Sequence, residues 1–282
     1  MENAQRPTMR SRKLGQRLRA IREDRGLTLQ KAARLLNRTP SSLSKLETGK
    51  RGIRRPALEN MLDRYGLTDL DERECLFGLA KDSGKKGWWL RYESNLSSTT
   101  LDYISVEAEA TSMNSFQLHL IPGLLQAKEY AYAVNACGIC QGDSPDVEAL
   151  TEIRMRRQQV LFKGDPPHLW AIVSEGALRQ QFGGCEVMKI QLRRLVELSW
   201  LSNVTLQVLP FAVSGHAGLN GSFTTLTTND LSVTLVENLT TGWYLEDPDE
   251  VRSYDVVFDH LRAVALAPSD SRAMIEQLLS ES

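Results

Sequence analysis

Two short helical segments, separated by a turn of three residues, lie within the first fifty residues and constrain the fold most strongly. Residues 29–36 carry apolar side chains at helical spacing, and Thr28 precedes them as the N-cap residue. Thr39 precedes a second segment, residues 40–47, which begins with proline. Asn37 stands in the turn, where left-handed backbone is less costly for asparagine than for most residues with a β-carbon. The sequence therefore predicts two helices that cross closely at a tight turn.

Three further helical patterns surround this pair. Residues 11–25 repeat leucine and isoleucine on one face, and Gly26 follows as a left-handed cap. A fourth helix is predicted to begin near Pro56 and a fifth near Asp69, because apolar residues again recur at helical spacing. We therefore expect an all-α domain of five helices over residues 1–82.

The charge of the chain is divided unevenly between its two parts. Residues 1–65 contain 17 lysines and arginines against 6 acidic residues, whereas residues 66–282 contain 17 against 29. Such a division is expected when one domain contacts a polyanion and the other does not. The alternative is a basic, solvated surface without a partner.

Length and composition limit the remaining possibilities. A chain of 282 residues is long enough for two domains. No run approaches the roughly 18 apolar residues of a membrane span, so no membrane partner is predicted. The polar, basic residues 1–13 do not resemble a secretory signal, which leads us to expect a cytoplasmic protein. Four cysteines at this length do not indicate a disulfide framework.

Three parts of the N-terminal sequence together resemble the XRE family, the five-helix domain shared with the phage λ and 434 repressors. They are Gly26-Leu27-Thr28, Ala33, and the run Ser44-Lys45-Leu46-Glu47-Thr48-Gly49-Lys50. The resemblance implies a λ-repressor-like domain that binds double-stranded DNA and inserts its third helix, residues 40–48, into the major groove. Ala33 would be the small residue at which the two motif helices cross.

The resemblance also assigns roles to individual side chains. Base edges would be contacted by Ser41 and Lys45, with Ser42 and Ser44 at their flanks. Arg22 would pair with Glu47 and hold the first helix against the third. The phosphate contacts would come from Thr39, Thr48, Lys50, Arg51 and Arg55.

Two positions depart from the family pattern. Leu29 stands where the family often has glutamine, so one polar contact to DNA or to the third helix is missing. Asn37 replaces the usual turn glycine, which we expect to cost little. The short, hydroxyl-rich recognition face predicts modest base discrimination, assisted by DNA shape.

The second half of the chain follows a small, charged linker at residues 83–87. Beyond it, residues 88–282 alternate predicted strands and helices, including a hairpin around Asn229-Asp230, which predicts a mixed α+β domain and an α+β chain overall. Longer helices are expected over 124–136, from Ser144-Pro145 to about 162, and after a Ser269 cap. Trp88 and Trp89 are expected to pack in or beside this domain rather than to form a functional aromatic patch.

This half resembles large actinobacterial regulators of the WhiJ type, which join an XRE domain to a conserved C-terminal domain. The resemblance is carried by Ile121-Pro122-Gly123-Leu124-Leu125-Gln126, Glu129-Tyr130-Ala131, Arg154…Arg157-Gln158, Glu175…Leu178-Arg179 and Val208-Leu209-Pro210-Phe211. It implies a developmental or antitoxin-like regulator that works with a small partner protein. By the same pattern Glu175 would form a buried ion pair with Arg154 or Arg157.

No catalytic residues, metal ligands or cofactors are predicted in this half. Cys137 and Cys140 have metal-ligand spacing, but no further ligands accompany them, and the four histidines are scattered. The glycine-rich run 215–221 follows a strand and precedes another, so it lacks the helix N-terminus of a phosphate cradle. A flexible loop is the simpler interpretation, with ligand or partner contact left open.

The function predicted from the sequence is that of a DNA-binding transcription regulator, acting as a homodimer. Its C-terminal domain would dimerise and receive a signal from a partner protein or a small-molecule effector. One alternative is an antitoxin-like protein whose primary role is to bind a small partner protein. A second is an enzyme fused to a DNA-binding domain, which these residues do not favour.

Overall fold

The structure is a computed structural model that describes residues 8–81, 87–137, 146–237 and 242–281. The chain divides into two compact units: the N-terminal unit comprises residues up to Leu90 together with Asn229–Leu231, and the C-terminal unit comprises Arg91–Thr228 and the residues from Ser232 onward. Residues 83–86 of the expected linker, the expected Ser144-Pro145 helix start and Cys140 lie outside the described residues.

The N-terminal unit is built from helices, as predicted. Its described helices are α1 (Met9–Asp24), α2 (Leu29–Leu35), α3 (Pro40–Glu47), α4 (Arg55–Tyr65) and α5 (Leu70–Lys81). Helix α1 begins two residues earlier than expected, because the Thr8 hydroxyl caps it and Met9 is buried. Leu18, Leu43 and Leu58 are fully shielded from solvent, so the helices share one apolar core.

The C-terminal unit is organised around one mixed sheet. Its strands follow the order β3-β2-β1-β4-β5-β6. Strands β1, β2 and β3 are parallel, whereas β4, β5 and β6 continue the sheet in antiparallel pairing. The bounds are β1 (Ser112–Gln117), β2 (His168–Ser174), β3 (Val204–Leu209), β4 (Phe223–Thr227), β5 (Ser232–Glu237) and β6 (Gly242–Leu245). The α+β class predicted for the chain is confirmed.

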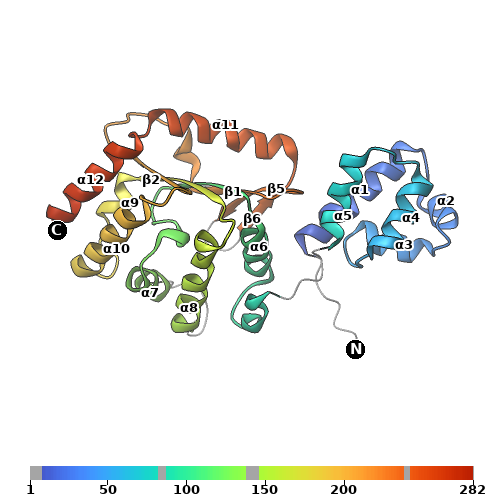
Figure 1. Cartoon of the computed structure of the whole chain (residues 1–282), viewed down its shortest axis with the longest axis horizontal. Helices are drawn as coiled ribbons and strands as arrows, with labels where there is room; N and C mark the ends of the chain where they lie inside the picture. The colour runs from blue at the N-terminus through green and yellow to red at the C-terminus, as the bar shows by residue number, and fades with distance from the viewer. Residues whose placement is uncertain (1–7, 82–86, 138–145, 238–241, 282) are drawn as a thin grey trace. The chain divides into compact units, whose positions relative to one another are not determined.

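Helices cover both faces of this sheet (Figure 1). The longer ones are α6 (Ser98–Glu109), α7 (Lys128–Ala136), α8 (Val147–Arg157), α10 (Cys185–Leu198), α11 (Pro248–Val264) and α12 (Pro268–Glu281). Short helical turns occur at η1 (Trp88–Tyr92), η2 (Gly123–Leu125), η3 (Gln158–Phe162), α9 (Glu175–Arg179) and η4 (Ala217–Asn220). Trp88 and Trp89 are half-buried, and their rings meet edge to face at a centroid distance of 5.9 Å.

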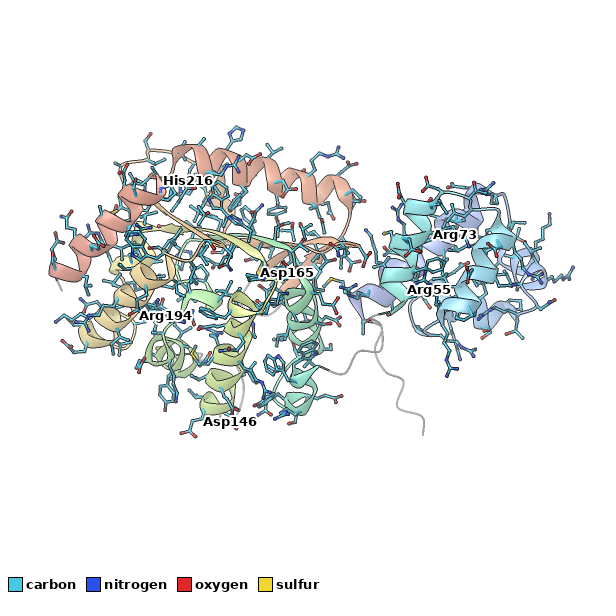
Figure 2. All side chains as sticks on the ribbon, in the orientation of Figure 1. Arg55, Arg73, Asp146, Asp165, Arg194 and His216 are labelled. Carbon is cyan, nitrogen blue, oxygen red and sulfur yellow. The ribbon has the colours of Figure 1, made fainter. Side chains whose placement is uncertain are left out.

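The two faces of the sheet differ in character. On the face covered by α11, Phe116 and Phe223 stand opposite each other on β1 and β4 and pack with Phe258 of α11 in an apolar core. Side chains alternate along a strand, so Met113, Ser115 and Gln117 of β1 point to the opposite face, where α6, α7 and α8 lie. Figure 2 shows His216 on the α11 side, and Asp146 and Arg194 on the other.

Several predicted helix boundaries were wrong. The helix expected over 124–136 begins only at Lys128, because residues 121–127 form a 3-10 turn and extended backbone. The long helix expected to reach residue 162 ends at Arg157 and continues as η3. Ser269 lies inside α12, which starts at Pro268 because proline suits the first helical position.

The predicted partners of Glu175 were also wrong. Its carboxylate lies 2.6 Å from Nε of Arg179, one turn later in α9, and accepts a hydrogen bond of 2.8 Å from the amide of Phe211. Arg157 instead donates two bonds, of 2.8 and 2.7 Å, to Glu107 of α6. Sequence motifs place these residues in order along the chain but do not determine which carboxylate each arginine reaches.

Two kinds of feature are absent from the described residues. No helix there combines the length and the apolar character that a bilayer crossing requires. In the same ranges, histidine, cysteine and acidic residues form no group of three that could hold a metal ion.

The glycine-rich run 215–221 packs against the sheet. Residues 217–220 form η4, and the amide of Gly218 donates to Nδ1 of His216 at 3.2 Å. Gly218 is buried, and a β-carbon there would collide with the ring of Phe116, which is itself fully buried. A β-carbon on Gly215 would meet nothing within 4 Å. The glycine at 218 is therefore required by packing.

We expect Gly218→Ala to destabilise the C-terminal unit by about 1–3 kcal/mol, because the added methyl group would overlap the buried Phe116 ring in a core that is already filled. Gly215→Ala is the matched control and should change stability by less than about 0.5 kcal/mol. Denaturant unfolding of the full chain measures both. Equal stability of the two variants would contradict the account in which Gly218 packs directly against the Phe116 ring.

Candidate nucleic-acid interface

Helix α3 presents a polar face because its apolar residues turn inward. Leu43 and Leu46 are buried, whereas Ser41 and Lys45 are exposed and Ser42 and Ser44 are half-buried between them. This pattern follows from helical periodicity, which separates the two sets of side chains by about half a turn. The face that the sequence assigned to base contact is therefore a continuous strip of hydroxyl groups and one ammonium group.

The start of α3 is fixed by its capping residues. The Thr39 hydroxyl accepts a hydrogen bond of 3.2 Å from the amide of Ser42, and proline occupies the first helical position. Asn37 adopts a positive φ of 52° in the preceding turn, as expected. Ala32 and Ala33 of α2 are almost completely buried, which lets α2 approach α3 closely.

Helix α1 contacts the C-terminal end of α3 through glycine. A β-carbon on Gly15 would lie 2.7 Å from the carbonyl oxygen of Leu46. Gly49, with φ of 71°, approaches the backbone of α1 equally closely, since a β-carbon there would lie 2.8 Å from the nitrogen of Arg12. In the sequence, Gly49 stood out only as part of the run 44–50, and Gly15 did not stand out, because a single glycine in a helix does not reveal what packs against it.

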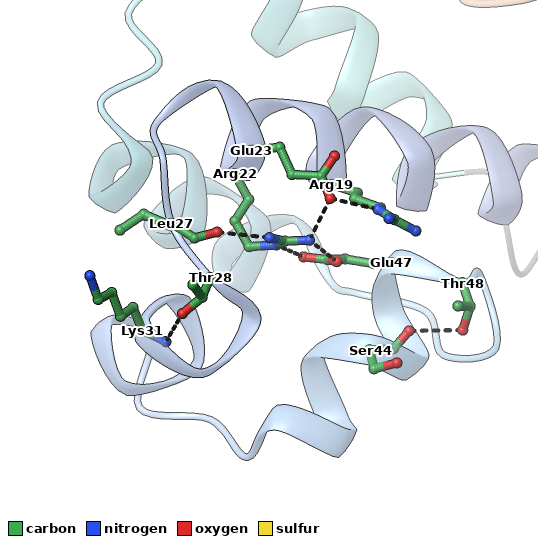
Figure 3. A network of polar contacts seen from close by, with 9 residues as sticks. All are labelled: Arg19, Arg22, Glu23, Leu27, Thr28, Lys31, Ser44, Glu47 and Thr48. Atoms are coloured by element: carbon green, nitrogen blue, oxygen red, sulfur yellow. Dashed lines mark hydrogen bonds and ion pairs between the residues drawn. The ribbon is translucent and has the colours of Figure 1, made fainter.

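An ion pair between α1 and α3 lies beside this contact (Figure 3). Arg22 donates from Nε and Nη2 to the two carboxylate oxygens of Glu47, at 2.7 and 2.9 Å. Its Nη1 donates to the carbonyl of Leu27 at 2.8 Å, and its Nη2 lies 3.2 Å from Glu23. The hydrogen bonds that Arg22 donates to Glu47 raise the pKa of Arg22 above its ordinary value.

Because the Arg22–Glu47 pair is buried, it determines how α1 and α3 pack together. Each of the two residues is only 7% exposed, so both charges have left water. Removing one charge would leave the other buried without compensation, which costs far more than the pair gains over an apolar alternative. The neighbouring Tyr65 is also buried, and this burial raises its pKa to about 12. Arg22 and Glu47 therefore fix α3 against α1.

The residues assigned to phosphate contact surround α3 but differ in their own contacts. Lys50 and Arg51 are exposed in the loop after α3, and Nη1 of Arg51 donates to the Ser42 hydroxyl at 3.0 Å. The Thr48 hydroxyl donates to the carbonyl of Ser44 at 2.8 Å within the helix. Thr39 and Thr48 are both exposed.

Arg55 lies at the start of α4 and contacts α5. It donates to Glu74 at 3.0 Å, and its guanidinium lies 4.4 Å from the centroid of the Phe77 ring. Arg73 approaches the same ring at 5.8 Å, and Figure 2 labels both arginines. The Arg55–Glu74 pair is exposed, so exchange of Glu74 for a phosphate would cost little.

Comparison with known families agrees with this arrangement. Residues 13–76, which span most of α1, all of α2, α3 and α4 and the first part of α5, match a helix-turn-helix domain. Residues 100–277 match a family described as a domain of unknown function (DUF5753). Because this match spans more than half of the sequence, the chain belongs to the DUF5753 family. No curated protein and no solved structure matches it. The helix-turn-helix domain indicates a DNA-binding regulator.

We expect Arg22→Met to destabilise the N-terminal unit by about 3–5 kcal/mol, because Glu47 loses its buried counter-charge. Arg19→Met is the matched control: Arg19 pairs with Glu23 on the exposed surface, and its loss should cost less than about 1 kcal/mol. Hydrogen–deuterium exchange of the α1 and α3 amides in the full chain measures the stability of the N-terminal unit separately from that of the C-terminal unit.

A further variant separates lost charge from lost packing. Arg22→Met combined with Glu47→Leu should recover much of the lost protection, since no buried charge is then left without a partner. Equal exchange rates in Arg22→Met and Arg19→Met would contradict the account of the buried pair.

Proposed function

We propose that this chain is a transcription regulator of the XRE type that reads duplex DNA with α3 in the major groove. The observation that carries the proposal is the polar face of α3, fixed by Arg22 and Glu47 and exposed on a unit with a large excess of basic residues. A helix suits this role because its diameter matches the width of the major groove.

Base readout is assigned to the exposed strip of α3. Lys45 can donate to the O6 and N7 acceptors of guanine, and Ser41 can donate or accept at several base edges. Ser42 and Ser44 would adjust the fit at the flanks. Because these side chains are short, discrimination should be modest, with DNA shape adding to it.

Backbone contacts are assigned to residues around the strip. Lys50 and Arg51 carry charge into the loop after α3, and Arg55 would exchange Glu74 for a phosphate. Thr39 would donate from its exposed hydroxyl, and Thr48 would exchange its hydroxyl bond to the Ser44 carbonyl for one to a phosphate. These contacts position the helix and displace condensed counterions, so affinity should fall steeply with salt.

The C-terminal domain is assigned regulation rather than catalysis. We propose that it joins two copies into a homodimer and receives a signal, as a WhiJ-type or antitoxin-like regulator working with a small partner protein in the cytoplasm. The acidic excess of residues 66–282 supports this division, because it disfavours contact with DNA and leaves the surface for other partners. A dimer would also bind two half-sites and so raise specificity.

Selection of bound sequences from randomised duplexes tests the proposal. The full chain should enrich two half-sites related by a dyad. Lys45→Ala should lose preference at one or two base pairs in each half-site, corresponding to about 1–3 kcal/mol per base pair. Lys50→Ala is the matched control, which should weaken all sequences alike and reduce the salt dependence.

Three results would count against the proposal. An unchanged preference in Lys45→Ala would remove this residue from base readout. A single half-site would argue against the dimer. A full chain that binds no duplex at low salt would exclude the regulator function itself.

A further inference from the structure

The side chain of Arg51 turns back from the loop after α3 to the beginning of that helix. Its Nη1 donates a hydrogen bond of 3.0 Å to the Ser42 hydroxyl. Ser42 lies in the first turn of α3, close after Pro40, whereas Arg51 lies beyond the helix end at Glu47. The order of residues in the chain places Arg51 behind α3, but its guanidinium lies beside the first turn of this helix.

The loop that carries Arg51 is fixed at both ends. On one side Gly49 is buried with a φ of 71°, and a β-carbon there would lie 2.8 Å from the backbone nitrogen of Arg12. On the other side Ile53 is buried and belongs to the apolar core of the N-terminal unit. Residues 50–52 bridge these two points, so the backbone of Arg51 has little freedom to move away from α3.

The Ser42 hydroxyl serves this contact because the helix does not use it as a cap. The amide of Ser42 donates to the Thr39 hydroxyl at 3.2 Å, so Thr39 supplies the cap at the start of α3. Ser42 Oγ accepts from Arg51, which leaves its own hydrogen as a donor. Ser42 and Arg51 together therefore present hydrogen-bond donors beside the first turn of α3.

This first turn is the part of α3 that should approach bases most closely. In helix-turn-helix proteins the N-terminal residues of the recognition helix contact the base edges. Ser41 and Ser42 occupy this turn, and both side chains are short, whereas the longer Lys45 lies about one turn further along. The Arg51 guanidinium thus brings a long side chain, with several donors, to the end of α3 where the helix itself offers only hydroxyls.

A guanidinium at this place matches guanine better than any other base. Guanine presents two acceptors, O6 and N7, on its major-groove edge, whereas adenine combines one acceptor with a donor. The planar fork of arginine donates to both acceptors at once, and this is the commonest specific contact between proteins and DNA. Phosphates also bind arginine, but they bound the groove, and the exposed Lys50 lies in the same loop to contact them.

We propose that Arg51 is a specificity-determining residue that reads one guanine in the major groove, and that Ser42 is the positioning residue that holds its guanidinium at the first turn of α3. The inference rests on the proposed function. It reassigns Arg51, which the family resemblance placed among the phosphate contacts. Lys50 retains the phosphate role.

Selection from randomised duplexes, carried out with the full chain and its variants, separates base readout from phosphate contact. The unchanged chain should enrich a guanine that Arg51→Met no longer enriches, with the preference for this base falling about tenfold or more. Arg51→Lys keeps the charge without the fork, so it should retain affinity but lose most of this preference. Lys50→Met is the matched control from the same loop and should weaken all sequences alike.

A change to the DNA assigns the contact to the base edge. Replacing the enriched guanine by 7-deazaguanine removes the N7 acceptor, which should weaken binding of the unchanged chain about tenfold and leave binding of Arg51→Met unaltered. Ser42→Ala should lose part of the preference for the same guanine, because the guanidinium is no longer held. Ser44→Ala is the matched control and should keep this preference, since Ser44 does not contact Arg51.

The possible failures are distinguishable. A full chain that binds duplex, but whose preference at every position survives in Arg51→Met or in Arg51→Lys with 7-deazaguanine tolerated, would overturn this inference alone and return Arg51 to the phosphate contacts. A selected site without guanine would also overturn it. A full chain that binds no duplex at low salt would overturn the proposed function together with it. Thermal unfolding checks that the variants fold, as expected for an exposed side chain.

Discussion

The ion pair between Arg22 and Glu47 is the interaction on which the candidate interface depends. Both charges are buried, and the guanidinium also bonds to the carbonyl of Leu27 at the end of the α1–α2 turn. Close backbone contacts at Gly15 and Gly49 leave no room for α3 to slide along α1. Such a pair adds little net stability over apolar packing, but its geometry specifies one arrangement. Because the buried pair and these backbone contacts fix the orientation of α3, they determine which of its side chains face solvent.

The C-terminal unit uses buried polar groups in a different way. One face of its sheet is closed by the aromatic core beneath α11, which needs only apolar area. The other face retains a cavity, and the adjoining segment 121–127 is neither helix nor strand. Gln126, Gln158 and Gln191 satisfy the backbone groups that regular structure would otherwise satisfy. An apolar core alone does not require an irregular segment whose backbone is fixed by three buried glutamines.

Local signals in the sequence predicted local structure well. Caps at Thr28 and Thr39, the turn at Asn37 and apolar periodicity were sufficient for the N-terminal helices, because their causes lie within a few residues. Contacts between residues far apart in the chain could not be predicted from these local signals in the sequence. The partners of Glu175, the close approach at Gly15 and the glutamine-fixed segment 121–127 each involve such contacts. Two arginines near one another in sequence did not reveal that Arg157 bonds to Glu107 and Arg154 to Gln126.

Amide NMR of the full chain, titrated with the duplex that it selects, tests the central claim most directly. The account predicts that the largest shifts fall on residues 40–51, with smaller shifts near Arg55 and none on α11. It also predicts that added salt reverses these shifts as counterions recondense on the DNA. Shifts centred on the C-terminal sheet, with α3 unaffected at low salt, would contradict the account, because DNA would then be bound by the acidic half of the chain.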